Sequence, residues 1–255
     1  MPRTLTVASQ KGGVGKTTTT VNLGCCLGQA GRSVLIVDLD PQANATSGVG
    51  LERDDPEVSA LRALLDGDDL EPAILDAPTP NVRVLPASGD ASDLDLLQDL
   101  IAHSPERLRE TLSRSTEDYE YVLIDCPPTL RGPPTIALHL SDAVIIPVQC
   151  EYYAMEGLSQ ILPVVREIQE SANPALAIEG LLLTMFSPEL ELSRDVASEI
   201  RQYFGDVAFR AVIPRDVTLA EAASHGEPAI RYSPLSRGAW SYVELAREVI
   251  ENGEA

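Results

Sequence analysis

The stretch Gln10-Lys11-Gly12-Gly13-Val14-Gly15-Lys16-Thr17-Thr18 decides how this chain folds. A glycine-rich loop of this kind joins a strand to a helix and turns backbone N–H groups inward around phosphate oxygens. The apolar run Thr4–Ala8 before it predicts a short strand, and Thr17–Ala30 after it predicts a helix. The loop also holds the chain's two lysines, whereas the other seventeen basic residues are arginines. Two compact, mobile ammonium groups at this point predict a site for phosphate groups.

The end of the loop, Gly15-Lys16-Thr17, completes a P-loop in the context that this motif requires. We expect Lys16 to reach the β- and γ-phosphates of a nucleotide, Thr17 to offer its hydroxyl to Mg²⁺, and Thr18 to hydrogen-bond the α-phosphate. The strict pattern G-x-x-x-x-G-K-[ST] is not met, because Gln10 stands where its first glycine would be. The alternative is a glycine-rich turn without a ligand, and the flanking strand and helix argue against it.

Strand and helix patterns alternate along the rest of the chain. Gly31 ends the first helix, and Ser33–Asp38 is a strand too apolar to face water on either side. These elements form a βαβ unit with parallel strands and a right-handed crossover. We therefore predict an α/β fold of the P-loop NTPase type, with a doubly wound, mostly parallel sheet flanked by helices, as one domain over residues 1–255.

Further elements follow from the same periodicities. The segment Glu52–Asp76, rich in Asp and Pro, is expected to be an irregular surface excursion. Strands are expected at Val82–Pro86, Tyr121–Asp125, Ala143–Val148, Ile178–Thr184 and Val207–Ile213, and helices at Ser92–Ala102, Pro105–Ser115, Ala154–Ser171, Leu192–Phe204 and Pro234–Glu251.

Acidic residues follow two of the expected strands. Asp38 and Asp40 come at the end of the second strand, and Asp125 ends the strand that begins at Tyr121. Because ligands of doubly wound sheets bind beyond the C-terminal strand ends, these three acids are expected to converge on the phosphate loop. One such Asp alone would more often be a helix cap or a turn former. It is their combination with the loop that indicates a nucleotide site.

The segment from Lys11 to Thr17 resembles the deviant Walker A loop of the ParA/MinD ATPase family. The resemblance implies ATP and Mg²⁺ as cofactors and a homodimer with ATP sandwiched between the subunits. In such a dimer Lys11 reaches the nucleotide of the other subunit and stabilises charge there, as an arginine finger does. Gly12 would lie where the two subunits and the two nucleotides meet.

The resemblance also assigns roles to individual residues. Asp40 would orient or activate the attacking water, so that Lys11, Lys16 and Asp40 form the catalytic set. Thr17, Asp38 and Asp125 would act on Mg²⁺, the two acids largely through its coordinated waters. The nucleotide-binding residues that it implies are Lys11, Gly12, Gly13, Val14, Gly15, Lys16, Thr17, Thr18, Pro214 and Asp216, with the last two bordering the adenine.

Similarity extends almost from end to end and is strongest to the chromosomal ParA (Soj) branch, as in residues 40–48, 147–158 and 236–239. That branch implies slow ATP hydrolysis stimulated by a ParB-like partner, and ATP-gated non-specific DNA binding during chromosome or plasmid segregation. This chain departs from it at Glu189 and Thr218, which stand where arginines are expected. Each lost phosphate contact weakens non-specific DNA binding. An ATP-gated switch that binds a protein partner without DNA is therefore kept as the alternative.

Composition narrows the functional classes. The net charge of −20, from 39 acidic and 19 basic residues, repels nucleic acid unless local basic patches override it. No apolar stretch approaches the roughly 18 to 20 residues of a membrane span, and the acidic end Val243–Ala255 differs from a basic membrane-targeting helix. We expect a cytoplasmic protein without membrane anchoring, associated with the nucleoid if it binds DNA.

Four cysteines lack metal-ligand spacing, so we expect buried thiols. They are Cys25, Cys26, Cys126 and Cys150. A third alternative, an iron–sulfur ATPase of the nitrogenase-reductase type, is disfavoured because Cys126 and Cys150 are not in that family's cluster-ligand contexts.

Overall fold

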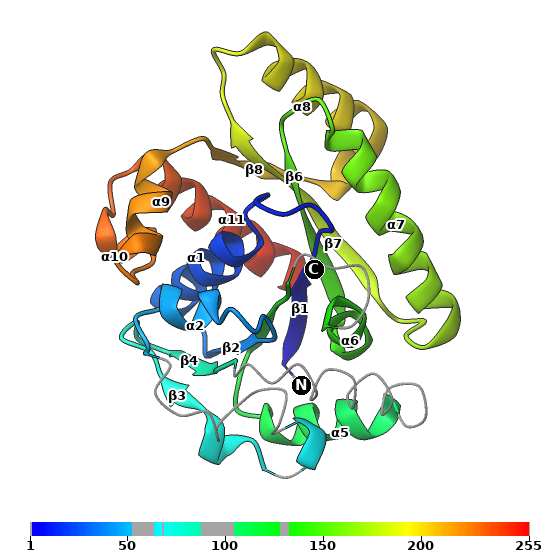
Figure 1. Ribbon diagram of the computed structural model, residues 1–255, viewed down its shortest axis with the longest axis vertical. Coiled ribbons are helices and arrows are strands. Elements are labelled where there is room, and N and C mark those ends of the chain that lie inside the picture. The colour runs from blue at the N-terminus through cyan, green and yellow to red at the C-terminus, as the bar shows by residue number, and fades with distance from the viewer. Residues whose placement is uncertain (1, 53–63, 68, 88–104, 128–132, 255) are drawn as a thin grey trace.

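A single eight-stranded sheet runs through the computed structural model, which describes residues 2–52, 64–67, 69–87, 105–127 and 133–254 (Figure 1). The strand order is β3-β4-β2-β5-β1-β6-β7-β8, and all neighbouring pairs are parallel except β3 with β4. The strands are β1 Arg3–Val7, β2 Val34–Asp38, β3 Leu75–Asp76, β4 Val82–Leu85, β5 Tyr121–Asp125, β6 Ala143–Gln149, β7 Ala177–Phe186 and β8 Ala208–Pro214.

Helices cover both faces of this sheet (Figure 1). The helices α1 and α11 pack on one face with α9 and α10 beside them, while α5, α6, α7 and α8 pack on the other. The α-helices are α1 Lys16–Gln29, α2 Asn44–Gly48, α5 Pro105–Ser115, α6 Pro133–Leu140, α7 Ala154–Ser171, α8 Glu191–Phe204, α9 Val217–Ser224, α10 Ala229–Tyr232 and α11 Arg237–Glu254; short 3₁₀ turns occupy Glu71–Ala73 and Gly205–Val207.

The second strand shows why the sheet needs two layers of helices. Successive side chains of a strand point to opposite faces. In β2, Val34 and Ile36 join the core beneath α1 and α11, and Leu35 and Val37 join the core beneath α5 and α6. All five residues of this strand are buried, so neither face is left to water.

Helix α1 packs very closely on the sheet. A side chain at Gly24 would lie 2.9 Å from Ile36, and one at Gly28 would lie 2.6 Å from the carbonyl oxygen of Pro80. The absence of side chains at these two positions lets the helix backbone approach the strands. The close packing places the start of α1, and with it the glycine-rich loop, beside the C-terminal ends of β1, β2 and β5.

The predicted doubly wound, mostly parallel sheet is confirmed. Every predicted strand is present within about a residue or two of its predicted ends, and four of the later helices occupy their predicted positions. The last of them begins at Arg237 instead of Pro234, because Pro234 and Leu235 form a turn. The predicted helix Ser92–Ala102 lies outside the described residues, as do residues 53–63 and 68 of the segment Glu52–Asp76. The described part of that segment corrects the expectation of an irregular surface excursion, because Leu75–Asp76 form β3 and Leu64 and Leu70 are completely buried in the core.

Among the α-helices given above for the described residues, four were not predicted. Helix α6 has the sequence PPTIALHL, in which Ile136, Ala137, Leu138 and Leu140 are all buried. It therefore lacks the polar face by which a surface helix is recognised in a sequence. The helices α2, α9 and α10 have only five, eight and four residues, too few to show a helical period.

Candidate nucleotide-binding site

The glycine-rich loop has the backbone geometry of an anion-binding turn. Gly13 and Gly15 have φ angles of +73° and +92°, in the left-handed region that favours glycine. No side chain caps the start of α1, whose first N–H groups are thus left for another acceptor. A side chain at Gly12 or Gly13 would meet no atom of this chain within 4 Å, so the outer side of the loop is open.

The two lysines of the loop have different surroundings. Lys16 is 6% exposed, and its Nζ lies 3.3 Å from the carbonyl oxygen of Lys11. Burial lowers the pKa of the Lys16 ammonium, an effect that the charges of Asp125 and Asp40 oppose. Lys11 is half-buried and lines a small hollow together with Tyr153 and Gly157 at the start of α7. Lys16 therefore belongs to the interior of the site, and Lys11 to its rim.

Asp125, at the end of β5, accepts hydrogen bonds from two hydroxyls of α1. Thr17 Oγ1 donates to one carboxylate oxygen at 2.8 Å, and Thr20 Oγ1 donates to the other at 3.0 Å. The carboxylate is completely buried, and burial, reinforced by the nearby charge of Asp38, raises its pKa. Thr17 and Asp125 are thus adjacent, as a shared role at a metal ion requires.

Asp38 lies beside Asp125 in the register of β2 with β5. It too is completely buried, and burial raises its pKa although Thr46 and the backbone of Asp40 hydrogen-bond to it. Asp40 is 6% exposed and accepts a hydrogen bond from the backbone N–H of Gln42. The structure therefore brings the three acids to the same strand ends, next to the phosphate loop.

This cluster fits a hydrated magnesium ion. Carboxylate and hydroxyl oxygens are the ligands that Mg²⁺ prefers, and a divalent cation would stabilise the ionised forms of two buried acids. Among the described residues, no three Asp, Glu, His or Cys side chains converge closely enough to hold a metal by themselves. The arrangement therefore suits an ion held by Thr17 and phosphate oxygens, with the acids acting through water.

Pro214 is the last residue of the edge strand β8, and Asp216 follows it at the start of α9. The Asp216 carboxylate caps α9 through the N–H of Thr218 at 3.0 Å and also accepts from the N–H of Gly238, in α11, at 2.8 Å. Burial alone would raise the pKa of Asp216, but these hydrogen bonds outweigh it and lower the pKa. Its carboxylate thus fixes two helices relative to each other.

Three threonines were missed by the sequence reasoning. Thr20 and Thr46 hold Asp125 and Asp38, and Thr184 donates to the carbonyl of Val14 in the phosphate loop. All three are buried. Their partners are distant in sequence or lie beyond a turn, so the sequence pattern gives no signal for them.

Comparisons with known proteins identify the family of the chain. A family profile described as an AAA domain matches residues 2–178. The chain is 46% identical to the sporulation initiation inhibitor protein Soj of Bacillus subtilis, over 99% of this chain and 100% of that protein. It is 41% identical to the chromosome partitioning protein ParA of Caulobacter vibrioides, over 97% of this chain and 94% of that protein.

The chain belongs to the ParA/MinD family of P-loop ATPases.

Solved structures agree with this membership. The cell division ATPase MinD of Pyrococcus furiosus superposes with a TM-score of 0.80 at 30% identity, over 99% of this chain and 100% of that one. A cobyrinic acid a,c-diamide synthase of Mycobacterium smegmatis, with bound ATP analogue and magnesium, gives 0.87 at 32% identity, over 100% and 96%. The predictions of an ATPase with ATP and Mg²⁺ as cofactors are confirmed.

One of these two neighbours is named as a cell division ATPase and the other as a synthase, so the shared fold does not by itself determine the task of a protein. No helix in the described ranges is long and apolar enough to cross a membrane. All four cysteines are buried, as predicted, and burial raises the pKa of each thiol.

Proposed function

We propose that this ParA/MinD-type ATPase closes into a homodimer around two molecules of Mg·ATP and acts in chromosome or plasmid segregation, or in positioning another cargo. Non-specific DNA is its matrix, and a ParB-like partner stimulates hydrolysis and release. The near full-length similarity to Soj and ParA supports the segregation role.

The observation that carries the dimer is the separation of the two lysines. Lys16 is buried in its own phosphate loop, whereas Lys11 lies at the rim, beside Gly12 and Gly13, where side chains would meet nothing of this chain. A cation at an open rim can serve the nucleotide of a second subunit. Lys16 would then bind phosphate in its own subunit, and Asp40 would position the attacking water.

Substitution of each lysine tests this division. Lys11→Ala should still bind Mg·ATP in isothermal titration calorimetry, because Lys16 is intact, but should remain a monomer in ATP and lose partner-stimulated hydrolysis. Lys16→Ala is the matched control and should lose nucleotide binding itself. Mass determination by light scattering with ATP and with ADP reports the dimer. A Lys11→Ala protein that dimerises and is stimulated normally would refute the proposal.

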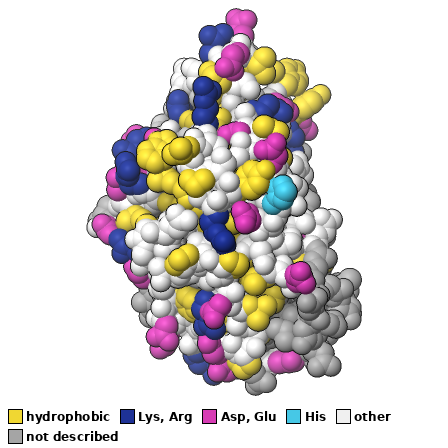
Figure 2. Space-filling view, turned by 90° about the vertical axis from the view of Figure 1, so that its left-hand side faces the viewer, with side chains coloured by type: hydrophobic (Ala, Val, Ile, Leu, Met, Phe, Trp, Pro, Cys, Tyr) yellow, Lys and Arg dark blue, Asp and Glu magenta, His cyan; other side chains and the backbone are white. Residues whose placement is uncertain are grey.

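A second candidate function is the ATP-gated protein-binding switch without DNA contact. Glu189 is exposed in the turn before α8, and Thr218 lies in the first turn of α9, so neither segment offers the expected arginine. Two exposed arginines form ion pairs with acids of this chain, since Arg215 pairs with Glu151 and Arg210 pairs with Glu248 and Glu251. On the face in Figure 2, Lys and Arg side chains are interspersed with Asp and Glu and form no continuous basic surface.

Co-sedimentation with DNA in ATP, repeated from low to physiological salt, separates the two functions. Binding that needs ATP and weakens steeply with salt supports the DNA matrix. No binding even at low salt, by a protein that dimerises with ATP, supports the switch.

A further inference from the structure

The C-terminal end of β7 contacts the phosphate loop directly. Thr184 Oγ1 donates a hydrogen bond of 2.9 Å to the carbonyl oxygen of Val14, 170 residues earlier in the chain. Both residues are 2% exposed, so no water competes for either group. A side chain at Gly15 would lie 3.9 Å from the methyl group of Thr184, which places this threonine against the next residue of the loop as well.

This hydrogen bond fixes one peptide plane of the loop. In a trans peptide the C=O of one residue and the N–H of the next point in opposite directions. The hydroxyl of Thr184 holds the Val14 carbonyl toward β7, so the N–H of Gly15 is directed away from β7. Gly15 itself is in the left-handed region, with φ +92°, and immediately precedes Lys16. The N–H groups at this bend are the ones that a P-loop offers to phosphate oxygens.

The segment that carries Thr184 is held at its other side too. Met185 has a left-handed backbone, φ +52°, which is sparsely populated for a residue with a long side chain and persists when the surroundings fix it. Its sulfur accepts a hydrogen bond of 3.1 Å from Gln149 at the end of β6. The carbonyl of Phe186 accepts from the backbone N–H of Arg215, next to Pro214, at 2.9 Å.

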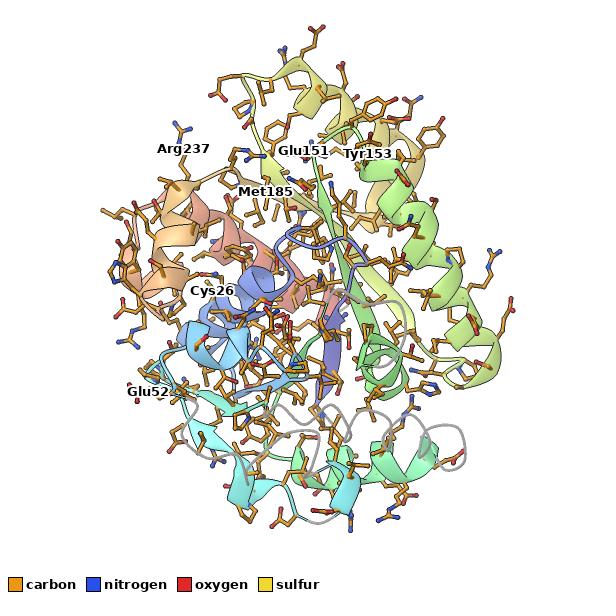
Figure 3. The ribbon with its side chains drawn as sticks, viewed as in Figure 1. Cys26, Glu52, Glu151, Tyr153, Met185 and Arg237 are labelled. Carbon is orange, nitrogen blue, oxygen red and sulfur yellow. The ribbon has the colours of Figure 1, made fainter. Side chains whose placement is uncertain are left out.

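Figure 3 shows Met185, at the end of β7, near Glu151, which follows β6. Neighbouring strand ends on both sides therefore hold the tripeptide from Thr184 to Phe186. It joins the phosphate loop at one end to the segment proposed for the base at the other.

We infer that Thr184 is a positioning residue for nucleotide binding, which orients the Gly15 N–H toward phosphate through the Val14 carbonyl. This role rests on the proposed placement of phosphate in the loop. Because Thr184 acts on the loop and not on the base, removal of its hydroxyl should weaken the binding of every ligand with a polyphosphate chain to the same extent.

Thr184→Val tests the role, since valine keeps the shape and removes the donor. We expect the affinities for Mg·ATP and for Mg·tripolyphosphate to fall together by up to about tenfold, because the ligand must then orient a peptide plane that the hydrogen bond no longer holds. Thr184→Ser restores the hydroxyl and should bind within about twofold of the unaltered protein. Titration calorimetry far below the melting temperature measures both ligands without relying on hydrolysis.

Thr116→Val is the control for a structural effect. Thr116 is equally buried and donates to the carbonyl of Leu112 at 2.7 Å, but it lies in the segment that follows α5. The Thr116→Val substitution should lower the melting temperature and leave the affinities for Mg·ATP and Mg·tripolyphosphate unchanged. If the valine variant does not fold, Thr184→Cys replaces it, because a thiol is only a weak donor. Its affinities for the two ligands are then compared with those of Thr184→Ser.

Normal affinity of Thr184→Val for both ligands would overturn the inference, as would a serine variant as weak as the valine variant. Failure of the unaltered protein to bind Mg·ATP would instead refute the nucleotide site itself, so the two failures are distinguishable.

Discussion

Thr46 donates two hydrogen bonds to the same carboxylate oxygen of Asp38, one from its backbone N–H and one from its hydroxyl, each 2.8 Å long. The other oxygen of Asp38 accepts from the N–H of Asp40 at 3.1 Å. Three donors therefore face an acid that no water reaches. The arrangement ties α2 to the end of β2 and holds Asp38 in place beside Asp125, so that the site is partly built before any ligand enters.

The first prediction removes one of these donors. Thr46→Val should lower the free energy of unfolding by about 1.5–3 kcal/mol, because a hydrogen bond to a charged group is lost in the interior. Losing a donor to the ionised form should also raise the pKa of Asp38 further. Urea unfolding at neutral pH measures the change, and Thr46→Ser, which keeps the hydroxyl, should recover most of it. A Thr46→Val protein as stable as the unaltered one would show that the contact contributes nothing.

The second prediction concerns pH. Burial raises the pKa of Asp38 to about 6 and that of Asp125 to about 7, from 3.8. Between pH 4 and 7 the folded protein then binds more protons than the unfolded chain, so its stability without metal falls as pH rises through this window. Because Mg²⁺ favours the ionised acids, the rise in melting temperature caused by Mg·ADP should be larger at pH 7.5 than at pH 5.5.

The Asp125→Asn variant separates the effect of Asp125 from that of the other acids of the chain, whose mutual repulsion also changes over this pH range. This variant should flatten the pH dependence of the metal-free melting temperature, since the amide does not titrate. A dependence equal to that of the unaltered protein would mean that Asp125 is not the titrating group.

The parts of the fold that could be predicted are those with local signals. A few neighbouring residues are enough to predict a glycine-rich loop between a strand and a helix, or an apolar strand such as Val34–Asp38. The convergence of Asp38 and Asp125 then follows from the rule for strand ends. The residues that fix the geometry give no such signal.

Thr184 and Val14 are 170 residues apart, and Thr20 and Asp125 are 105 residues apart. Only the register of the folded sheet brings them together. Asp216 shows the same limit, since nothing in the sequence near it indicates that its carboxylate also accepts from Gly238 in the last helix. Which hydroxyl meets which carbonyl is decided by tertiary packing, which periodicity does not encode.

The third prediction addresses a partly buried ion pair between the first strand and β7, beside the last helix. Arg3 on β1 pairs with Glu179 on β7 and also donates a hydrogen bond to the carbonyl oxygen of Val249 in α11. Glu179 in turn accepts a hydrogen bond from the side chain of Asn252. The Glu179 side chain is 3% exposed. Glu179→Ala should lower the free energy of unfolding by about 1.5–3 kcal/mol in a urea titration, because Arg3 loses a charged hydrogen-bond partner that is itself buried.

Glu251→Ala provides the comparison for this ion pair. Glu251 pairs with Arg210 at 2.6 Å, but both side chains are more than half exposed. Exposed pairs are worth at most about 1 kcal/mol, so this variant should be nearly neutral in the same urea titration. If Glu179→Ala and Glu251→Ala lowered the free energy of unfolding equally, burial would not be what makes the Arg3–Glu179 pair stabilising.

The fourth prediction introduces arginines at the two positions where the family resemblance leads us to expect them. If the surface formed by the turn before α8 and the start of α9 faces DNA in the ATP dimer, Glu189→Arg removes a repelling charge and adds a cation that can bind phosphate. Apparent DNA affinity with ATP should rise at least tenfold at low salt. The slope of log affinity against log salt should steepen by about 0.9 for each additional DNA phosphate that the dimer neutralises. Glu189→Arg combined with Thr218→Arg should steepen it again.

Glu199→Arg is the charge-matched control, because Glu199 is also exposed on α8 but lies about two turns beyond the N-terminal end. It changes the net charge equally and should give a much smaller effect if the location of the cation matters. Fluorescence anisotropy of a labelled duplex, in ATP and in ADP, measures all four proteins. If Glu189→Arg and Glu199→Arg enhance binding equally, or if the enhancement does not need ATP, only bulk charge has changed. The protein-binding switch would then be the better account of this chain.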